Sequence, residues 1–165
     1  ILRKTFPQIQ LHLVGPCMKS EKNIFESTLN QFDPHNKWIH YIGEVQNKDL
    51  IGIYHNADIG VFASSCENLP LILLENMAAG IPIACSDQGP MPEVLKSGGI
   101  YFNPEKPHEI TEALSKFLFS AQLCHEKATI SHELSLNYSW ESCANKTFKF
   151  IANTANNFNL DNSQK

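Results

Sequence analysis

Two glutamates, Glu67 and Glu75, stand where their carboxylates could bind a ligand. Glu67 follows a short apolar run, residues 59–63, and Glu75 belongs to a segment, residues 70–79, whose other residues are almost all apolar. Such a segment is buried if it is helical, so a carboxylate within it must be hydrogen-bonded or paired with a cation. A carboxylate has up to about four acceptor sites, which makes it a suitable partner for sugar hydroxyls.

The spacing leaves two interpretations open. In the first, Glu75 accepts a hydrogen bond from a backbone N–H or a lysine, and Glu67 only caps the following helix, because acidic residues are common near helix N-termini. In the second, the helix N-terminus faces a diphosphate through its free N–H groups and its dipole, and both carboxylates accept hydrogen bonds from sugar hydroxyls.

Apolar runs alternate with helical stretches along most of the chain. The expected strands are residues 8–14, 38–42, 59–63, 81–85 and 100–102, and the expected helices are residues 20–32, 48–56, 70–79, 92–96, 107–119, 121–136 and 139–158. This alternation predicts the α/β class, with a doubly wound, Rossmann-like parallel sheet. Runs 59–63 and 81–85 are continuously apolar, which predicts inner strands buried on both faces. Ligands of such sheets bind at the carboxyl ends of the strands, where Glu67 is expected.

The composition argues against several classes of protein. The 165 residues fit one domain, and 42% of them are hydrophobic, as in globular proteins. The net charge is -4 and no three lysines or arginines are adjacent, which argues against nucleic-acid binding. The five cysteines form no C-x-x-C pair, which argues against a disulfide framework and a zinc ribbon. The longest apolar run, residues 69–74, is far shorter than the ~20 residues of a membrane helix.

Other residues that could carry chemistry are poorly placed for it. The seven histidines show no metal-ligand spacing, so we expect neither a metal nor a cofactor. Ser64 and Ser65 are not surrounded by a G-x-S-x-G motif, which argues against a serine hydrolase.

The region around the glutamates contains a longer motif. Ser64-Ser65 precedes Glu67-x7-Glu75, and Asn76-Met77-Ala78-Ala79-Gly80-Ile81-Pro82 follows it. Further motifs occur in a fixed order: Val14-Gly15, Tyr41-Ile42-Gly43, Tyr54-x3-Asp58, Gly89-Pro90-x-Pro92-Glu93-Val94, Tyr101-Phe102-x-Pro104 and Tyr138-Ser139-Trp140. This ordered set, between residues 7 and 151, resembles the retaining family 4 ("group 1") glycosyltransferases. Glu67-Asn68-x-Pro70 is most similar to members that build bacterial surface polysaccharides.

The resemblance implies the GT-B fold, in which two Rossmann-like halves enclose the active site. The chain is similar to the C-terminal half, so residues 1–158 are expected to be the nucleotide-sugar-binding domain and residues 159–165 a polar tail. The N-terminal acceptor domain and the first strand of this half are then absent from the sequence. The chain begins at Ile1 without a signal-peptide pattern, and we expect it to be part of a longer protein.

The same resemblance implies roles for individual residues. Glu67 is the candidate catalytic residue, beside the transferred sugar, and Glu75 would hold the ribose hydroxyls. The other candidate substrate-binding residues are Ser65, Asn68, Leu69, Leu71 and Gly15. Backbone N–H groups of the turn 68–71 would face the sugar and the diphosphate, but Pro70 has no N–H to donate. The family's Gly-Arg…Lys element, whose cations neutralise the diphosphate, would precede Pro7 and is absent from the sequence.

The implied function is transfer of a sugar from a nucleotide diphosphate sugar, with retention of configuration, to a saccharide or lipid-linked acceptor held by the N-terminal domain. A non-catalytic sugar-nucleotide-binding or interaction domain and a fragment of a nucleotide-sugar epimerase remain as alternatives. We expect a cytoplasmic protein, whose longer form could associate peripherally with the inner face of the membrane. The chain by itself is expected to be inactive as a transferase, because one wall of the cleft is missing. The nucleotide base, the sugar and the acceptor are not determined by the sequence.

Overall fold

The computed structural model describes residues 1–162, with side chains through Phe158. The elements are η1 (Leu2–Lys4, a 3-10 helix), β1 (Leu11–Val14), α1 (Lys22–Phe32), β2 (Ile39–Gly43), α2 (Asn47–His55), β3 (Gly60–Phe62), α3 (Leu71–Ala78), β4 (Ile83–Ser86), α4 (Met91–Leu95), β5 (Gly99–Phe102), α5 (Pro107–Phe119), α6 (Ala121–Ser135) and α7 (Trp140–Asn162). Every expected strand and helix is present, with ends that differ by up to four residues. Helix η1 was not expected. Helix α7 continues to Asn162, so the first part of the expected tail 159–165 is helical, and residues 163–165 lie outside the described residues.

All strand pairs are parallel, which confirms the α/β class with Rossmann-like connections. The strands form two sheets, however, and not the single sheet that was expected: β1 pairs with β2, and β3, β4 and β5 pair in that order. Strand β4 is the inner strand and is buried throughout, as predicted. The prediction was wrong for β3, which is an edge strand, and Val61 at its centre is 43% exposed. Val61 is exposed because its side chain points away from the face on which Gly60 and Phe62 are buried.

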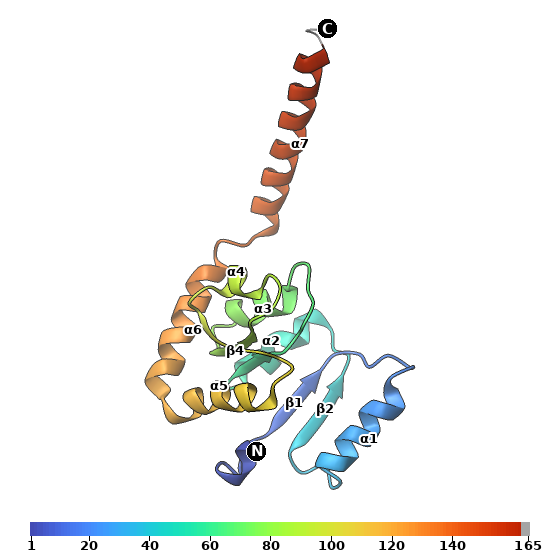
Figure 1. Cartoon of the computed structure of the whole chain (residues 1–165), viewed down its shortest axis with the longest axis vertical. Helices are drawn as coiled ribbons and strands as arrows, with labels where there is room; N and C mark the ends of the chain where they lie inside the picture. The colour runs from blue at the N-terminus through green and yellow to red at the C-terminus, as the bar shows by residue number, and fades with distance from the viewer. Residues whose placement is uncertain (163–165) are drawn as a thin grey trace.

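Helices cover both faces of the three-stranded sheet. On one face, Ile83 and Cys85 of β4 pack with side chains of α3 and α4. On the other face, Ala84 and Phe102 pack with Ala113 and Phe117 of α5. In Figure 1, the three-stranded sheet and the helices packed on it form one compact body, and β1, β2 and α1 lie to one side of that body.

Helix α3, which carries Glu75, is fixed by contacts along its length. Leu73, Asn76 and Met77 are buried. The Asn76 side chain lies directly against Gly60 of β3. A Cβ added to Gly60 would collide with Asn76 Oδ1. At the C-terminal end, His132 Nδ1 of α6 is 3.0 Å from the Ala78 carbonyl oxygen, and because a carbonyl only accepts, this nitrogen carries the proton. Helix α3 is therefore a rigid platform for the glutamate.

The sheet of β1 and β2 has a thinner core. Phe25 of α1 packs edge-on against Tyr41 of β2, with ring centroids 4.8 Å apart. Ile24 of α1 is 66% exposed because no other layer covers that face of the helix within the described residues. Arg3 lies over the Trp38 ring, 5.0 Å from its centroid, and donates a hydrogen bond to the Ile9 carbonyl. The only arginine of the chain is therefore engaged away from the two glutamates.

Asp33 fixes the turn between α1 and β2. Its side chain is buried, and Oδ2 accepts hydrogen bonds from the N–H groups of Trp38 at 2.7 Å and Ile39 at 2.9 Å. Burial acts to raise the pKa of Asp33, but the backbone N–H groups of Lys37, Trp38 and Ile39 and the charge of Arg3 outweigh it and lower this pKa to about 2.

This depressed pKa predicts how stability varies with pH. An unfolded aspartate titrates near pH ~3.9, so the ionised Asp33 contributes its full stabilisation above that pH and loses it as the pH falls toward about 2. Asp33→Asn is expected to lower the melting temperature at pH 7, and the difference from the wild type should shrink between pH ~4 and ~2. Thermal unfolding followed by circular dichroism at several pH values measures this, with Asp58→Asn, at an exposed position, as the control. A difference that stays constant over this pH range would contradict the assignment.

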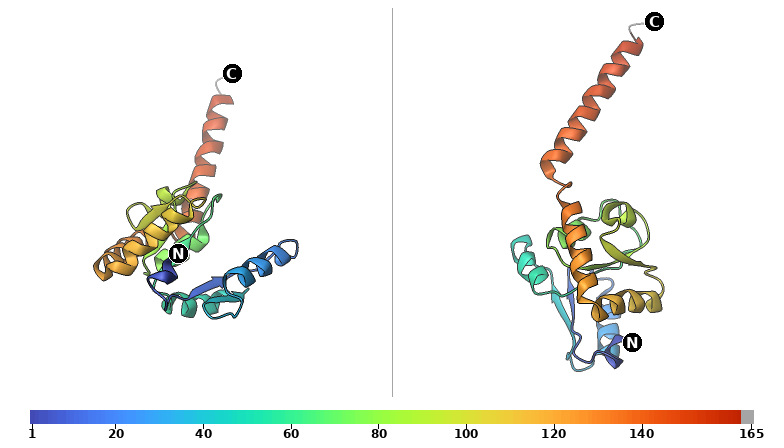
Figure 2. Two further views of the ribbon diagram at one scale, coloured as in Figure 1. Left: turned by 60° about the horizontal axis from the view of Figure 1, so that its bottom comes forward. Right: turned by 90° about the vertical axis from the view of Figure 1, so that its left-hand side faces the viewer.

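Helix α7 projects from the body as a long single helix, which all views show (Figures 1 and 2). Its exposed aromatic residues are Trp140, Phe148, Phe150 and Phe158. In the described part of the chain, no helix combines the length and the apolar character needed to cross a membrane.

Candidate functional site

Glu75 lies in the second turn of α3 and is half-buried. Its Oε2 accepts a hydrogen bond of 2.9 Å from the Tyr54 hydroxyl, which belongs to α2. Among residues 1–158, no other side chain or backbone N–H donates to this carboxylate. Glu75 is thus satisfied on one oxygen by a tyrosine, and not by the backbone N–H or lysine of the first interpretation. The other oxygen, Oε1, remains able to accept.

Tyr54 keeps its proton in this arrangement. Burial raises the pKa of Tyr54, and the hydrogen bond and the negative charge of Glu75 raise it further. The hydroxyl is therefore a permanent donor at neutral pH. Tyr54 belongs to the motif Tyr54-x3-Asp58, which does not identify it as a partner of Glu75. The only available signal was that motif, because 21 residues separate the two side chains.

Glu67 lies in the loop between β3 and α3 and is also half-buried. The N-cap of α3 is Pro70, and no side chain caps the helix, so Glu67 does not have the capping role of the first interpretation. The Glu67 carbonyl lies close to the loop that follows β4, about 4.0 Å from the place where a Cβ on Gly89 would stand. The structure therefore brings together the loops after β3 and β4, both at the carboxyl ends of parallel strands.

The N-terminus of α3 offers fewer donors from the turn 68–71 than expected. The Leu71 N–H already donates to the Leu69 carbonyl at 2.9 Å, and Pro70 has no N–H. The expectation that the Leu71 N–H is available to a ligand is therefore wrong for this conformation. The N–H groups of Ile72 and Leu73 in the first turn have no hydrogen-bond partner among the described residues. Leu73 is fully buried, so the Ile72 N–H, together with the helix dipole, is the donor of this turn that an anion could meet.

The other expected binding residues of this loop are on the surface. Ser65 and Asn68 are exposed, and Leu69 and Leu71 are 52% and 46% exposed. The neighbouring Ser64 hydroxyl donates to the Cys66 carbonyl at 3.3 Å and so stabilises the loop. Ser65, Asn68, Leu69 and Leu71 therefore form part of the exposed surface around the N-terminus of α3.

Gly15 ends β1 with a backbone φ of 131°, which favours glycine. Its N–H donates to the Gly43 carbonyl at 2.9 Å, and its own carbonyl accepts from the Tyr41 hydroxyl at 3.0 Å. No atom lies within 4 Å of the place where a Cβ would stand, so the glycine borders open space. Within the described chain no hydrogen bond joins this turn to either glutamate.

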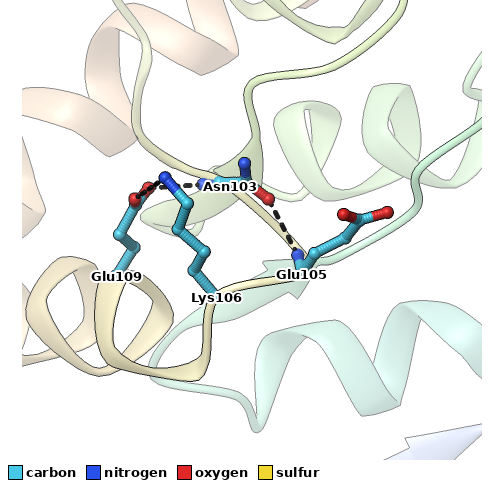
Figure 3. Close-up of polar contacts among 4 residues, drawn as sticks. All are labelled: Asn103, Glu105, Lys106 and Glu109. Carbon is cyan, nitrogen blue, oxygen red and sulfur yellow. Dashed lines mark hydrogen bonds and ion pairs between the residues drawn. The ribbon is translucent and has the colours of Figure 1, made fainter.

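The loop after β5 is held by its own polar groups, as Figure 3 shows. The Asn103 N–H donates to Glu109 Oε2 and the Glu105 N–H to Asn103 Oδ1, both at 2.9 Å. Lys106 Nζ is 2.9 Å from Glu109 Oε1. The hydrogen bond from Lys106, followed by that from Asn103, lowers the pKa of Glu109, and the same pairing raises the pKa of Lys106. Lys106 is therefore occupied by a structural carboxylate at this edge of the sheet.

The two glutamates lie on an open edge and do not line an enclosed cavity. A hollow of about 600 Å³ lies beside α1 and is lined in part by Lys22, Phe25 and Tyr41, without either glutamate. In the described part of the chain, no group of three histidine, cysteine, aspartate or glutamate side chains is arranged to hold a metal ion. The site consists of carboxylates and backbone donors, a set suited to hydroxyl and phosphate groups.

The parallel strands, with Glu67 and Glu75 at or near their carboxyl ends, place the chain in the class of Rossmann-like α/β domains. The sequence pattern of the family described as "Glycosyl transferases group 1" matches residues 1–129, well over half of the 165 residues. The chain belongs to this family, and its fold is that of one half of a GT-B glycosyltransferase.

Among curated relatives, the chain is 29% identical over 110 residues to the O-antigen chain mannosyltransferase B of Escherichia coli. This match covers 67% of the chain and 29% of the relative. The chain spans about a third or less of the length of the curated relatives that it matches.

Solved structures of similar fold include Anabaena Alr3699/HepE in complex with UDP and glucose. The TM-score is 0.81 at 16% identity, over 92% of this chain and 42% of the other. The C-terminal domain of a group 1 family glycosyl transferase (LpcC) from Francisella tularensis matches with a TM-score of 0.72 at 23% identity, over 82% of this chain and 72% of that domain.

Proposed function

We propose that residues 1–158 are the nucleotide-sugar-binding half of a retaining glycosyltransferase, which moves a sugar from a nucleotide diphosphate sugar to a saccharide or lipid-linked acceptor. The observation that carries this proposal is the arrangement on α3. The Glu75 carboxylate is held on one oxygen by Tyr54 and keeps the other free, and the exposed, unpartnered N–H group of Ile72 lies in the first turn of the same helix. A ribose hydroxyl and a diphosphate can be bound together by these groups.

The relatives support the same class of donor and acceptor. The Anabaena protein of similar fold was solved in complex with UDP and glucose, and the E. coli relative is an O-antigen chain mannosyltransferase. Because the chain spans about a third or less of its curated relatives, a longer protein that contains it would supply the acceptor-binding domain. All five cysteines are free, as is usual in a reducing compartment, which supports a cytoplasmic protein. Association of the longer protein with the inner face of the membrane would bring it to a lipid-linked acceptor.

In the proposed reaction, the bond between the anomeric carbon and the diphosphate oxygen breaks while the acceptor hydroxyl attacks from the same face. The hydroxyl proton passes to the leaving phosphate. The Ile72 N–H would donate to a phosphate oxygen as charge develops on it, and Glu75 would hold the ribose. Glu67 would hydrogen-bond the transferred sugar and would not attack it, so the carboxylate-spacing rule of glycosidases does not apply.

Titration calorimetry of the purified chain with UDP, ADP and GDP tests the binding half of this proposal. One of these diphosphates is expected to bind at least about tenfold more tightly than its monophosphate, because the free Ile72 N–H group and the dipole of α3 would contact the second phosphate. Folding is checked by circular dichroism. A folded chain that binds none of the three, or that binds monophosphate and diphosphate equally, would contradict the proposed site.

An assay of a longer protein that contains this chain, with nucleotide sugars as substrates, distinguishes a transferase from an epimerase and from a binding domain. A transferase consumes the donor only when an acceptor is present and forms a new glycoside. Conversion of the donor sugar into its epimer without an acceptor would replace the proposal with an epimerase, and binding without turnover would leave a binding domain.

A further inference from the structure

The hydrogen bond between Tyr54 and Glu75 connects two elements that are otherwise loosely joined. Helix α2 lies between the two sheets in the sequence, and it does not pack closely on any other helix or strand of the described chain. Helix α3, in contrast, packs on α4, α6 and β3. The Tyr54 hydroxyl reaches from the loosely packed helix to a side chain on the well-packed one, at 2.9 Å.

From this geometry we infer that Tyr54 is a positioning residue for nucleotide binding, which acts by orienting the Glu75 carboxylate and does not itself touch the ligand. The inference rests on the proposed function, in which Glu75 binds the ribose. A glutamate side chain has three rotatable bonds, and fixing one carboxylate oxygen directs the other one toward a ligand before it arrives. Without the tyrosine hydroxyl, the carboxylate must be ordered when the nucleotide binds, and the affinity falls.

The state of the tyrosine agrees with this role. The Tyr54 hydroxyl donates its single hydrogen to Glu75 Oε2. Burial, together with the neighbouring carboxylate, raises the pKa of Tyr54. The hydroxyl therefore keeps its proton, and remains a donor, at neutral pH. No other hydrogen bond among residues 1–158 reaches the carboxylate, so no group in this part of the chain would replace the tyrosine.

Tyr54→Phe tests the inference, because it removes one hydroxyl and keeps the ring. We expect UDP, or whichever of ADP and GDP binds the wild type best, to bind the variant about three- to tenfold more weakly in titration calorimetry. The matched control is Tyr101→Phe, which removes another half-buried hydroxyl, one that donates to the Lys96 carbonyl at 2.6 Å, and which is expected to leave the affinity unchanged.

A double-mutant cycle separates positioning from a general loss of stability. If Tyr54 acts through Glu75, adding Tyr54→Phe to Glu75→Ala causes no further loss of affinity. Two outcomes overturn the inference and leave the proposed function intact. In the first, Tyr54→Phe lowers the nucleotide affinity equally in the wild type and in Glu75→Ala. In the second, Tyr54→Phe binds the nucleotide as well as the wild type does, while Glu75→Ala binds it weakly. Unchanged affinity in Glu75→Ala overturns both. If Tyr54→Phe is too unstable for calorimetry, the shift of the melting temperature by the same nucleotide gives the comparison, because ligand stabilisation depends on concentration relative to Kd.

Discussion

Replacing Glu75 by alanine is expected to weaken binding of a nucleoside diphosphate by about ten- to a hundredfold, and by more than the same change at Glu67. The ribose lies on the nucleotide itself, so hydrogen bonds from Glu75 form whether or not a sugar is attached. Hydrogen bonds to charged groups contribute roughly 1.5–3 kcal/mol, which corresponds to this loss. Glu75 stands on a helix that packs on α4, α6 and β3, and it is oriented by Tyr54, so little of this free energy is spent on ordering the carboxylate.

Glu67 is on a loop, beside the expected place of the transferred sugar. Glu67→Ala is therefore expected to change the affinity for the bare diphosphate little and to lower the turnover of a longer, active protein more than its affinity. Calorimetry on both variants compares the affinities, with Glu133→Ala, at an exposed position on α6, as the control. Equal affinities, or a larger loss for Glu67→Ala, would show that the two roles are exchanged or that Glu75 is only a structural carboxylate.

Purified residues 1–165 are expected to transfer no measurable sugar, even where they bind the nucleotide. The two glutamates lie on an open edge, and nothing in the described chain holds an acceptor opposite them. Alignment of two reactants in one site is worth roughly 10⁵-fold or more in rate, and a single wall cannot supply it. Mass spectrometry of reactions with nucleotide sugars and saccharide acceptors measures the product, with calorimetry on the same preparation as the control for binding.

The comparison is made with a longer protein that contains the chain and that transfers sugar under the same conditions. Product formed by residues 1–165 above the level of a heat-denatured sample would contradict this prediction. It would also mean that the open edge is closed by other means, for example by a second copy of the chain.

The sequence by itself predicted the elements and the fold class. Apolar residues alternate or run continuously over β1, β4 and β5, and they recur at helical spacing over α5. Side chains repeat with different periods in strands and helices, so these patterns indicate the local conformation. The parallel α/β class follows from the order of these elements, and the structure confirms it. The motif around Glu67 and Glu75 indicated the family correctly, because the family is defined by residue types in order and needs no coordinates.

Burial was predicted less well, because it depends on what packs against an element. Run 59–63 is as apolar as run 81–85, yet β3 lies at the edge of its sheet while β4 lies at the centre. Val61 shares the sheet face of Ala84, on which α5 packs, and is exposed because it lies on the edge strand, whereas no layer of the described chain covers the side of α1 that carries Ile24. An apolar pattern shows which face can be buried, and only the tertiary structure shows whether it is.

The details of the site were decided by the tertiary structure alone. Periodicity and motifs describe residues close in sequence, whereas the hydrogen bond from Tyr54 to Glu75 spans 21 residues and exists only because α2 is placed beside α3. The turn before α3 likewise engages the Leu71 N–H with the Leu69 carbonyl, which leaves the Ile72 N–H as the accessible donor of the first turn. Residue types determined which groups could bind a sugar nucleotide, and the packing of the helices determined which of those groups are free to do so, because a hydrogen-bonding group used within the protein is no longer available to a ligand.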